Sequence, residues 1–229
     1  VLDDLFFTFI DTAAKLRPKV IVAENVRGLI QGNAKGYVLQ IFAAMRVIGY
    51  RPQLFLLNAS RMGVPQRRER TFFVATREDL DAAPLKLEFI EPVVTVGQAF
   101  DGVAEEPEPP LGPAVMRSWM RTARGRSFSD VHPKGHHFNW IKLDPNTSAN
   151  TIAAKCCLCD WRSPRIITQA EAIRLQSFPD DYARKPGRAT DMRYVCGMSV
   201  PPFMTQRVAL EVGRQVFGID YDRTRRPLA

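Results

Sequence analysis

The chain has 229 residues, a net charge of +8, 45% hydrophobic residues and 24% charged residues, a composition that excludes disordered and fibrous proteins. No apolar run could span a membrane, the first residues lack a secretory signal pattern, and four cysteines are too few for a disulfide framework, so a cytoplasmic protein without membrane association is expected. Of the 32 basic residues 24 are arginine, which pairs in a two-pronged way with phosphate and guanine; this favours an anionic partner, although charge alone does not identify one.

Helix and strand patterns alternate over the first 80 residues. Apolar residues recur at helical spacing over 4–16 and 36–49. Runs at 20–23, 52–57 and 71–75 predict strands, and the first of these is wholly apolar, which is typical of a buried parallel strand. The alternation predicts an α/β layered sheet, a fold in which ligands bind at strand ends.

The pattern changes between residues 84 and 165. Residues 105–110 form an acidic, proline-rich stretch that suits neither a helix nor a central strand. Four arginines follow within ten residues, with no acidic residue among them: Arg117, Arg121, Arg124 and Arg126. Because no regular period dominates, an irregular, loop-rich lobe is expected here.

Two more helices are expected towards the end of the chain. Thr168 and Glu171 have the spacing of a capping box, which predicts a helix through Leu175. A last amphipathic helix is expected from near Pro201 toward Gly218.

The first motif with chemical content is Glu24-Asn25-Val26, which directly follows the apolar run at 20–23. A carboxylate at the end of a buried strand lies where α/β sheets place their ligands. Taken alone, the motif more often indicates a carboxylate that ends a strand and caps the next turn.

The second motif runs from Gln66 to Arg70 and leads into the expected strand at 71–75. In an extended segment Arg68 and Arg70 would share one face, where two guanidinium groups suit a base edge, a phosphate or a carboxylate. A solvated basic strand end is the alternative.

Two further motifs follow. In the segment 165–182, Glu171 can pair with Arg174 or with Arg165, which is typical of scaffolding. The turn at 197–202, Gly-Met-Ser-Val-Pro-Pro, enters the last helix, and its backbone donors could meet a polar ligand or simply begin that helix.

Taken together and in this order, the motifs resemble those of the DNA cytosine-5 methyltransferase family, over residues 1 to about 82 and 143–216. The resemblance implies an α/β fold: a partial S-adenosylmethionine-dependent methyltransferase sheet, Rossmann-like, with a smaller irregular target-recognition lobe. The implied domains are the C-terminal half of the catalytic domain at 1–83, the recognition lobe at 84–194, and a final helix returning to the catalytic domain at 195–229.

The implied reaction is methyl transfer from S-adenosylmethionine to carbon 5 of a cytosine flipped out of duplex DNA. Glu24 would hold this cytosine at N3 and the exocyclic amine, with a pKa raised so that it can donate a proton. Arg70 would contact the base O2, and Arg68 would support the catalytic loop.

The resemblance also implies contacts outside the base pocket. Gly197, Ser199 and Val200 would close over the cofactor. In the lobe, arginines would enter the major groove to read base edges and grip phosphates: Arg117, Arg121, Arg124 and Arg126.

Two family motifs are absent. The family's nucleophile is a cysteine in a Pro-Cys dipeptide before Glu-Asn-Val, and its cofactor pocket opens with Phe-x-Gly-x-Gly; neither occurs here. None of the four cysteines follows a proline and all come after Glu24, so the nucleophile is carried onto no residue. Met198 also replaces the asparagine usual in the last motif. A C-terminal portion or split subunit of a bacterial or phage enzyme is therefore expected, completed by an N-terminal chain or segment.

Three alternatives stay open. The chain could be a catalytically inactive DNA-binding module, or an RNA-directed relative that uses the same flipping chemistry. A zinc site could combine Cys156, Cys157 and Cys159 with His132, His136 or His137, but adjacent cysteines suit tetrahedral ligation poorly and paired Cys-x-x-Cys spacing is lacking. Cys156 and Cys157 are better read as small buried apolar residues, and no metal is expected.

Overall fold

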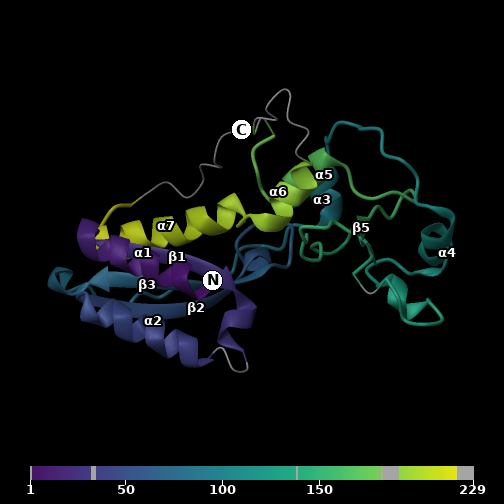
Figure 1. The fold of residues 1–229 in the computed structure, drawn as a ribbon. Helices are drawn as coiled ribbons and strands as arrows, with labels where there is room; N and C mark the ends of the chain where they lie inside the picture. Colours follow the sequence, from purple (N-terminus) through teal and green to yellow (C-terminus); the bar gives the residue numbers. More distant parts are fainter. Residues whose placement is uncertain (1, 32–34, 138, 181, 183–190, 221–229) are drawn as a thin grey trace. The chain divides into compact units, whose positions relative to one another are not determined.

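The computed structural model describes residues 2–31, 35–137, 139–180, 182 and 191–220 (Figure 1). Two compact units are interleaved along the chain. The first consists of residues 1–58, 69–88 and 209–221, and the second contains, among the described residues, 59–68 and 89–208. The domain boundaries predicted from the sequence stay predictions.

The first unit is built on a three-stranded sheet. Its strands are β1 (Val20–Val26), β2 (Tyr50–Asn58) and β3 (Glu69–Arg77), in the order β1-β3-β2. Both pairs of neighbours are antiparallel, and the register sets Glu24 opposite Phe72 and Val26 opposite Arg70.

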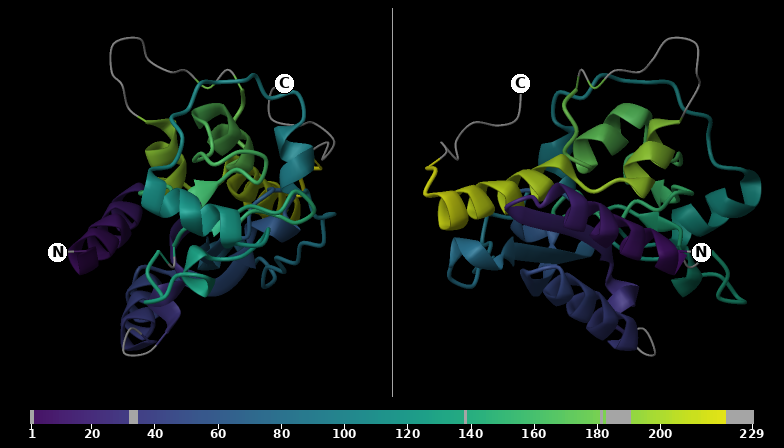
Figure 2. Two further views of the ribbon diagram at one scale, coloured as in Figure 1. Left: turned by 90° about the vertical axis from the view of Figure 1, so that its right-hand side faces the viewer. Right: turned by 60° about the vertical axis from the view of Figure 1, so that its left-hand side comes forward.

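Helices α1 (Leu2–Leu16) and α2 (Lys35–Val47) pack against one face of this sheet. Their apolar positions share a core with alternate residues of the strands: Ile10, Ala13, Ile41, Met45, Ile21, Phe73 and Ala75. Burying this apolar surface is the main stabilising contribution to the unit. The C-terminal half of α7 (Pro202–Phe217) lies over the face opposite α2, as Figures 1 and 2 show.

The predicted helices at 4–16 and 36–49 and all three predicted strands are confirmed. The prediction that 20–23 forms a buried parallel strand is wrong. Among the described residues β1 bonds only to β3, antiparallel, and Val22 is 42% exposed. An apolar run indicates a tendency to be buried, but it carries no information about the direction of the neighbouring strand.

The second unit has a core formed by three short helices and the loops between them. The helices are α3 (Val96–Phe100), α5 (Gln169–Leu175) and α6 (Met192–Met198). Loop residues complete the core: Leu143, Ala149, Ile152, Leu158 and Ile167. The capping box predicted at α5 is confirmed, since Thr168 and Glu171 exchange side chain to backbone hydrogen bonds.

The rest of the second unit is largely irregular, as the sequence predicted. Two-residue strands β4 (Ile141–Lys142) and β5 (Leu158–Cys159) pair in parallel. One helix, α4 (Pro113–Arg121), carries part of the arginine-rich segment, and it packs on a small cluster of Leu111, Phe128 and Cys159.

Within the described part of the chain, none of the helices combines the length and apolar content needed to cross a membrane.

Candidate functional site

Glu24 and Arg70 form an ion pair at the end of β1. The Oε1 atom of Glu24 lies 2.7 Å from Nε of Arg70. Arg70 faces Val26 across the β1–β3 ladder, so the two side chains meet as diagonal cross-strand neighbours. Burial lowers the pKa of Arg70, and the neighbouring Glu24 carboxylate opposes that effect. Both side chains keep some exposure, 27% for Glu24 and 15% for Arg70, so an external ligand can reach the pair.

This pair offers an anionic acceptor and a cationic donor side by side. A carboxylate accepts hydrogen bonds from an amine, or donates one when protonated, while a guanidinium donates to a carbonyl. The Watson–Crick edge of cytosine carries an amine, a ring nitrogen and a carbonyl in a row. The Glu24–Arg70 pair therefore has the donors and acceptors that a cytosine edge requires.

Arg68 is buried, with 1% of its surface exposed. Its Nη1 donates to the carbonyl of Ile152 and its Nη2 to the carbonyl of Gly197, both at 2.8 Å. Its guanidinium is thus enclosed by backbone groups of the second unit. This placement suits the supporting role implied for Arg68 and gives it no open face for a ligand.

Gln66 joins the second, third and fourth motifs, a role that sequence reasoning missed. It is fully buried, accepts a hydrogen bond from the backbone of Ile152 at 3.0 Å and donates to Gln176 Oε1 at 2.7 Å. Gln176 in turn donates to the carbonyl of Ser199 at 2.9 Å. Two buried glutamines therefore fix the segment before Arg68 against the ends of α5 and α6.

Gly197 lies in the last turn of α6, where the chain passes very close to another backbone segment. A Cβ atom at this position would lie 2.4 Å from the carbonyl carbon of Ala153, so only glycine fits. Ser199 caps the helix, its amide donating to the carbonyl of Val195 at 3.0 Å.

These contacts bear on the predicted cofactor residues. The carbonyls of Gly197 and Ser199 accept hydrogen bonds from Arg68 and Gln176, inside the unit. Val200 is half-buried. These groups alone do not form a pocket that fits S-adenosylmethionine, and their cofactor role stays a prediction.

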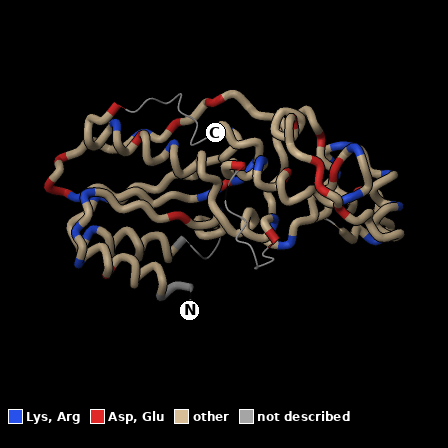
Figure 3. The backbone as a smooth tube through the Cα atoms, turned by 90° about the horizontal axis from the view of Figure 1, so that it is seen from above, with Lys and Arg blue, Asp and Glu red and all other residues tan. Residues whose placement is uncertain are grey.

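The predicted DNA-binding arginines lie on and after α4, along the basic segment seen in Figure 3. Arg117, Arg121 and Arg124 are exposed and, within the described residues, make no ion pair. Arg126 lies 2.8 Å from Asp130, so its charge is partly balanced. The first three are therefore the arginines available to an anionic partner.

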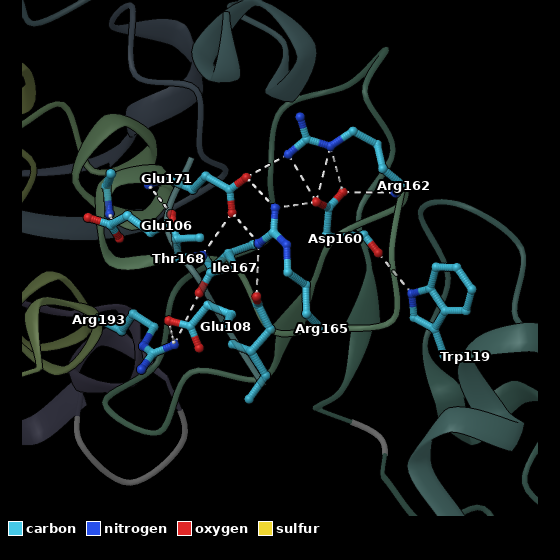
Figure 4. Close-up of polar contacts among 12 residues, drawn as sticks. Glu106, Glu108, Trp119, Asp160, Arg162, Arg165, Ile167, Thr168, Glu171 and Arg193 are labelled. Atoms are coloured by element: carbon cyan, nitrogen blue, oxygen red, sulfur yellow. Dashed lines mark hydrogen bonds and ion pairs between the residues drawn. The ribbon is translucent and has the colours of Figure 1, made fainter. Parts of the chain in front are cut away.

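The inner face of α4 is anchored. Trp119 donates from its indole nitrogen to the carbonyl of Asp160 at 2.8 Å (Figure 4). Lys142 Nζ lies 3.8 Å from the centre of the Trp119 ring and donates to the Trp119 carbonyl. Burial, together with the nearby charge of Arg124, lowers the pKa of Lys142.

Asp160 belongs to a buried network of charges that Figure 4 shows. Asp160 and Glu171 are 0% and 3% exposed. Arg165 donates to both oxygens of Glu171, at 2.7 and 2.8 Å, and pairs with Asp160 as well. Arg162 bridges the same two carboxylates. These bonds raise the pKa values of both arginines.

Of the two pairings predicted for Glu171, the one with Arg165 is confirmed. Arg174 instead donates to Asp180 at 2.6 Å. The scaffolding interpretation of this segment is supported by the burial of both carboxylates.

The four cysteines are placed as apolar residues. Cys157, Cys159 and Cys196 are buried, and Cys156 packs against the core. Burial raises the pKa of Cys156 to about 11 and that of Cys196 to about 12, and it raises those of Cys157 and Cys159 too. A nucleophilic cysteine needs the opposite shift. Among the described residues no group of three or more histidine, cysteine or acidic residues could hold a metal ion.

The first unit is an α/β unit with a carboxylate–guanidinium pair at the end of a strand. The second unit carries exposed arginines. The chain belongs to the C-5 cytosine-specific DNA methylase family, whose model matches residues 2–109 and 112–214. Members of this family use S-adenosylmethionine as the methyl donor.

Two relatives illustrate the match. The type II methyltransferase M.NgoFVII of Neisseria gonorrhoeae is 30% identical over 248 residues, which cover 96% of this chain and 65% of that protein. The type II methyltransferase M.AplI of Arthrospira platensis is 31% identical over 215 residues, covering 89% of this chain and 59% of that protein. The chain therefore spans 59–65% of the length of these relatives.

The fold has a counterpart among solved structures. A prophage-encoded protein of Escherichia coli, described as a candidate DNA modification methyltransferase, superposes with a TM-score of 0.76 at 19% identity. The superposition covers 94% of this chain and 74% of that one.

Proposed function

We propose that this chain is the part of a DNA cytosine-5 methyltransferase that holds the target cytosine and recognises the duplex. The observation that carries the proposal is the Glu24–Arg70 pair, 2.7 Å apart and partly exposed at the end of β1. The family match and the type II methyltransferase relatives support it. S-adenosylmethionine supplies the methyl group when bound.

In this proposal Glu24 and Arg70 bind the flipped base. Glu24 accepts from the exocyclic amine and holds a proton at N3, which makes the ring more open to attack at carbon 6. Arg70 donates to O2 and balances the carboxylate charge. Arg68 acts on the loop before β3 through its bonds to Ile152 and Gly197, so it is a positioning residue rather than a catalytic one.

The nucleophile and the glycine-rich cofactor strand have no counterpart in the 229 residues. We expect an N-terminal chain or segment to supply both, along with most of the cofactor pocket. Gly197, Ser199 and Val200 would then border that pocket from this chain.

The substrate proposed is duplex DNA, bound by the second unit. Arg117, Arg121 and Arg124 are exposed without ion pairs among the described residues, and Arg126 adds a partly balanced charge. Guanidinium groups of this kind contact phosphates and guanine edges.

The proposed setting is the DNA of a bacterium or phage in the cytoplasm, in line with the bacterial relatives. The proposed domains follow the same division. Residues 1–83 hold the flipped base, residues 84–194 recognise the duplex, and residues 195–229 form the helix that returns to the catalytic domain.

Incubation of the complete enzyme, or of this chain with its complementing N-terminal chain, with S-adenosylmethionine and duplex DNA tests the proposal. Mass spectrometry of the digested DNA should find 5-methylcytosine, and transfer RNA should be a poor competitor. Salt-dependent duplex binding with no methylated base would instead favour the inactive DNA-binding module. Preferential methylation of RNA would favour the RNA-directed alternative.

A further inference from the structure

Helix α4 exposes a large apolar side chain beside an exposed arginine. Met120 is 72% exposed. Arg117 lies three residues before Met120 and is therefore its neighbour on the helix surface, and Arg121 lies four residues after Arg117, on the next turn.

Met120 is not needed for the packing of α4. The apolar contacts of the helix come from Val115, Met116 and Trp119, which pack on the cluster around Phe128. A methionine side chain is flexible and polarizable and can adapt to a contacting surface, and here it lies next to Arg117, which makes no ion pair among the described residues.

Hydrogen bonds and a cation–ring contact of its buried and half-buried residues fix the position of helix α4. Trp119 is bonded to the carbonyl of Asp160 and lies under Lys142, and the Thr122 hydroxyl donates to the carbonyl of Ser118. An α-helix with its side chains is roughly 10–12 Å across, close to the roughly 12 Å width of the major groove of B-DNA. The helix is therefore a rigid element that a major groove can accept.

The chemistry of this face points to one feature of the groove. Charge complementarity favours DNA, since Arg117, Arg121 and Arg124 have no carboxylate partner among the described residues. The apolar group that base pairs present in the major groove is the C5-methyl group of thymine. RNA offers neither that methyl group nor an accessible major groove.

We propose that Met120 is a specificity-determining residue that contacts the methyl group of a thymine in the target site, with Arg117 and Arg121 on neighbouring phosphates or guanine edges. This inference rests on the proposed function, because it requires duplex DNA as the substrate. It adds the expectation that the recognition site contains a thymine in addition to the methylated cytosine.

The test begins with the sequence around the cytosines that the complete enzyme methylates. Each thymine of that site is then replaced in turn by uracil, which lacks only the methyl group. At one position the replacement should lower kcat/KM of the wild-type enzyme about four-fold, the effect of one methyl group removed from an apolar contact. Met120→Ala should lower kcat/KM on the thymine duplex by a similar factor and abolish the thymine/uracil difference. Met120→Leu should retain it.

Leu39→Ala, another exposed apolar position at 71% exposure, is the control and should leave the thymine/uracil ratio unchanged. A site without thymine, a wild-type enzyme indifferent to uracil, or a Met120→Ala enzyme that still discriminates would each overturn the inference while leaving DNA methylation intact. A hemimethylated duplex carries a C5-methyl group on a cytosine. If Met120→Ala changed kcat/KM only on such duplexes, that methyl group would be the contact, and the assignment to thymine would be overturned. Absence of any methylated duplex would overturn the proposed function itself.

Discussion

The Nη2 atom of Arg68 donates a 2.8 Å hydrogen bond to the carbonyl of Gly197, joining residues 129 positions apart in the sequence. Its Nη1 reaches Ile152 in the same way. One buried guanidinium thus connects three segments of the second unit, and two of them belong to motifs by which the family is recognised. The two contacts explain why an arginine is needed at position 68, and the close approach of the Ala153 backbone explains the glycine at position 197, before any ligand is considered.

Replacing Arg68 with methionine should strongly destabilise the second unit. Two buried carbonyls would lose their donors, at a cost of about 1–3 kcal/mol each in the free energy of unfolding. Urea denaturation measures this change. The matched control is Arg67→Met, because Arg67 is exposed and bonds Asn150 at 3.0 Å; its effect should stay below about 1 kcal/mol. Equal effects of the two variants would contradict the account.

Gly197→Ala should also destabilise the protein, because the added Cβ would overlap the backbone of Ala153 at 2.4 Å. Overpacking of this kind costs about 1–3 kcal/mol, or more where backbone must move. Gly36→Ala, in α2, where a Cβ would meet no atom of the described residues within 4 Å apart from its own helix and chain neighbours, should instead be neutral or stabilising by about 0.5–1 kcal/mol. Thermal unfolding of both variants distinguishes a close approach from a general preference for glycine.

Asp160→Asn should leave Arg162 and Arg165 with uncompensated charge in a buried network. Breaking one partner of a buried ion pair costs about 3–5 kcal/mol, here reduced because Glu171 remains and Arg162 is half exposed. We expect a loss of about 2 kcal/mol and a lower melting temperature. Asp180→Asn, which removes the exposed partner of Arg174, should cost less than about 1 kcal/mol. An Asp160→Asn protein as stable as Asp180→Asn would contradict the structural role of the network.

The cysteines should be unreactive in the native protein. With pKa values of about 11 for Cys156 and 12 for Cys196, the thiolate is scarce at pH 8, so alkylation by iodoacetamide should be far slower than after unfolding. The folded pKa values lie above the unfolded value of about 8.5, so the free energy of unfolding should fall as pH rises from about 8.5 toward 11. Consistent with this, the 229-residue chain alone should form no covalent adduct with duplex DNA containing 5-fluorocytosine. An adduct that maps to any of these cysteines would contradict the account.

The sequence predicted elements whose signals are local. Apolar periodicity located α1, α2 and the three strands, and the spacing of Thr168 and Glu171 located the start of α5. It did not predict the direction of the neighbour of β1, because pairing depends on residues distant in the chain. Helix α4 was not expected, yet Gly112-Pro113 at its start and apolar residues at 115, 116 and 119 are a signal that could have found it.

Some residues of the candidate site were likewise identified from the sequence, and others were not. Glu24 and Arg70 were identified by motif, and the structure brings them together as an ion pair. The burial of Arg68 could not be foreseen, since an arginine is seldom enclosed by carbonyl groups. The roles of Gln66 and Asp160 were missed because their partners lie in other segments of the chain. Long-range hydrogen bonding of this kind leaves no periodic trace in a sequence.

The most direct test of the central claim compares the complete enzyme carrying Glu24→Gln with the wild type. If Glu24 holds the proton at N3 of the flipped cytosine, the variant should lose about 100-fold or more in kcat for 5-methylcytosine formation while keeping its Kd for duplex DNA. Arg51→Gln, which changes an exposed arginine of β2, is the control and should retain the wild-type rate. A Glu24→Gln enzyme with wild-type kcat would contradict the account.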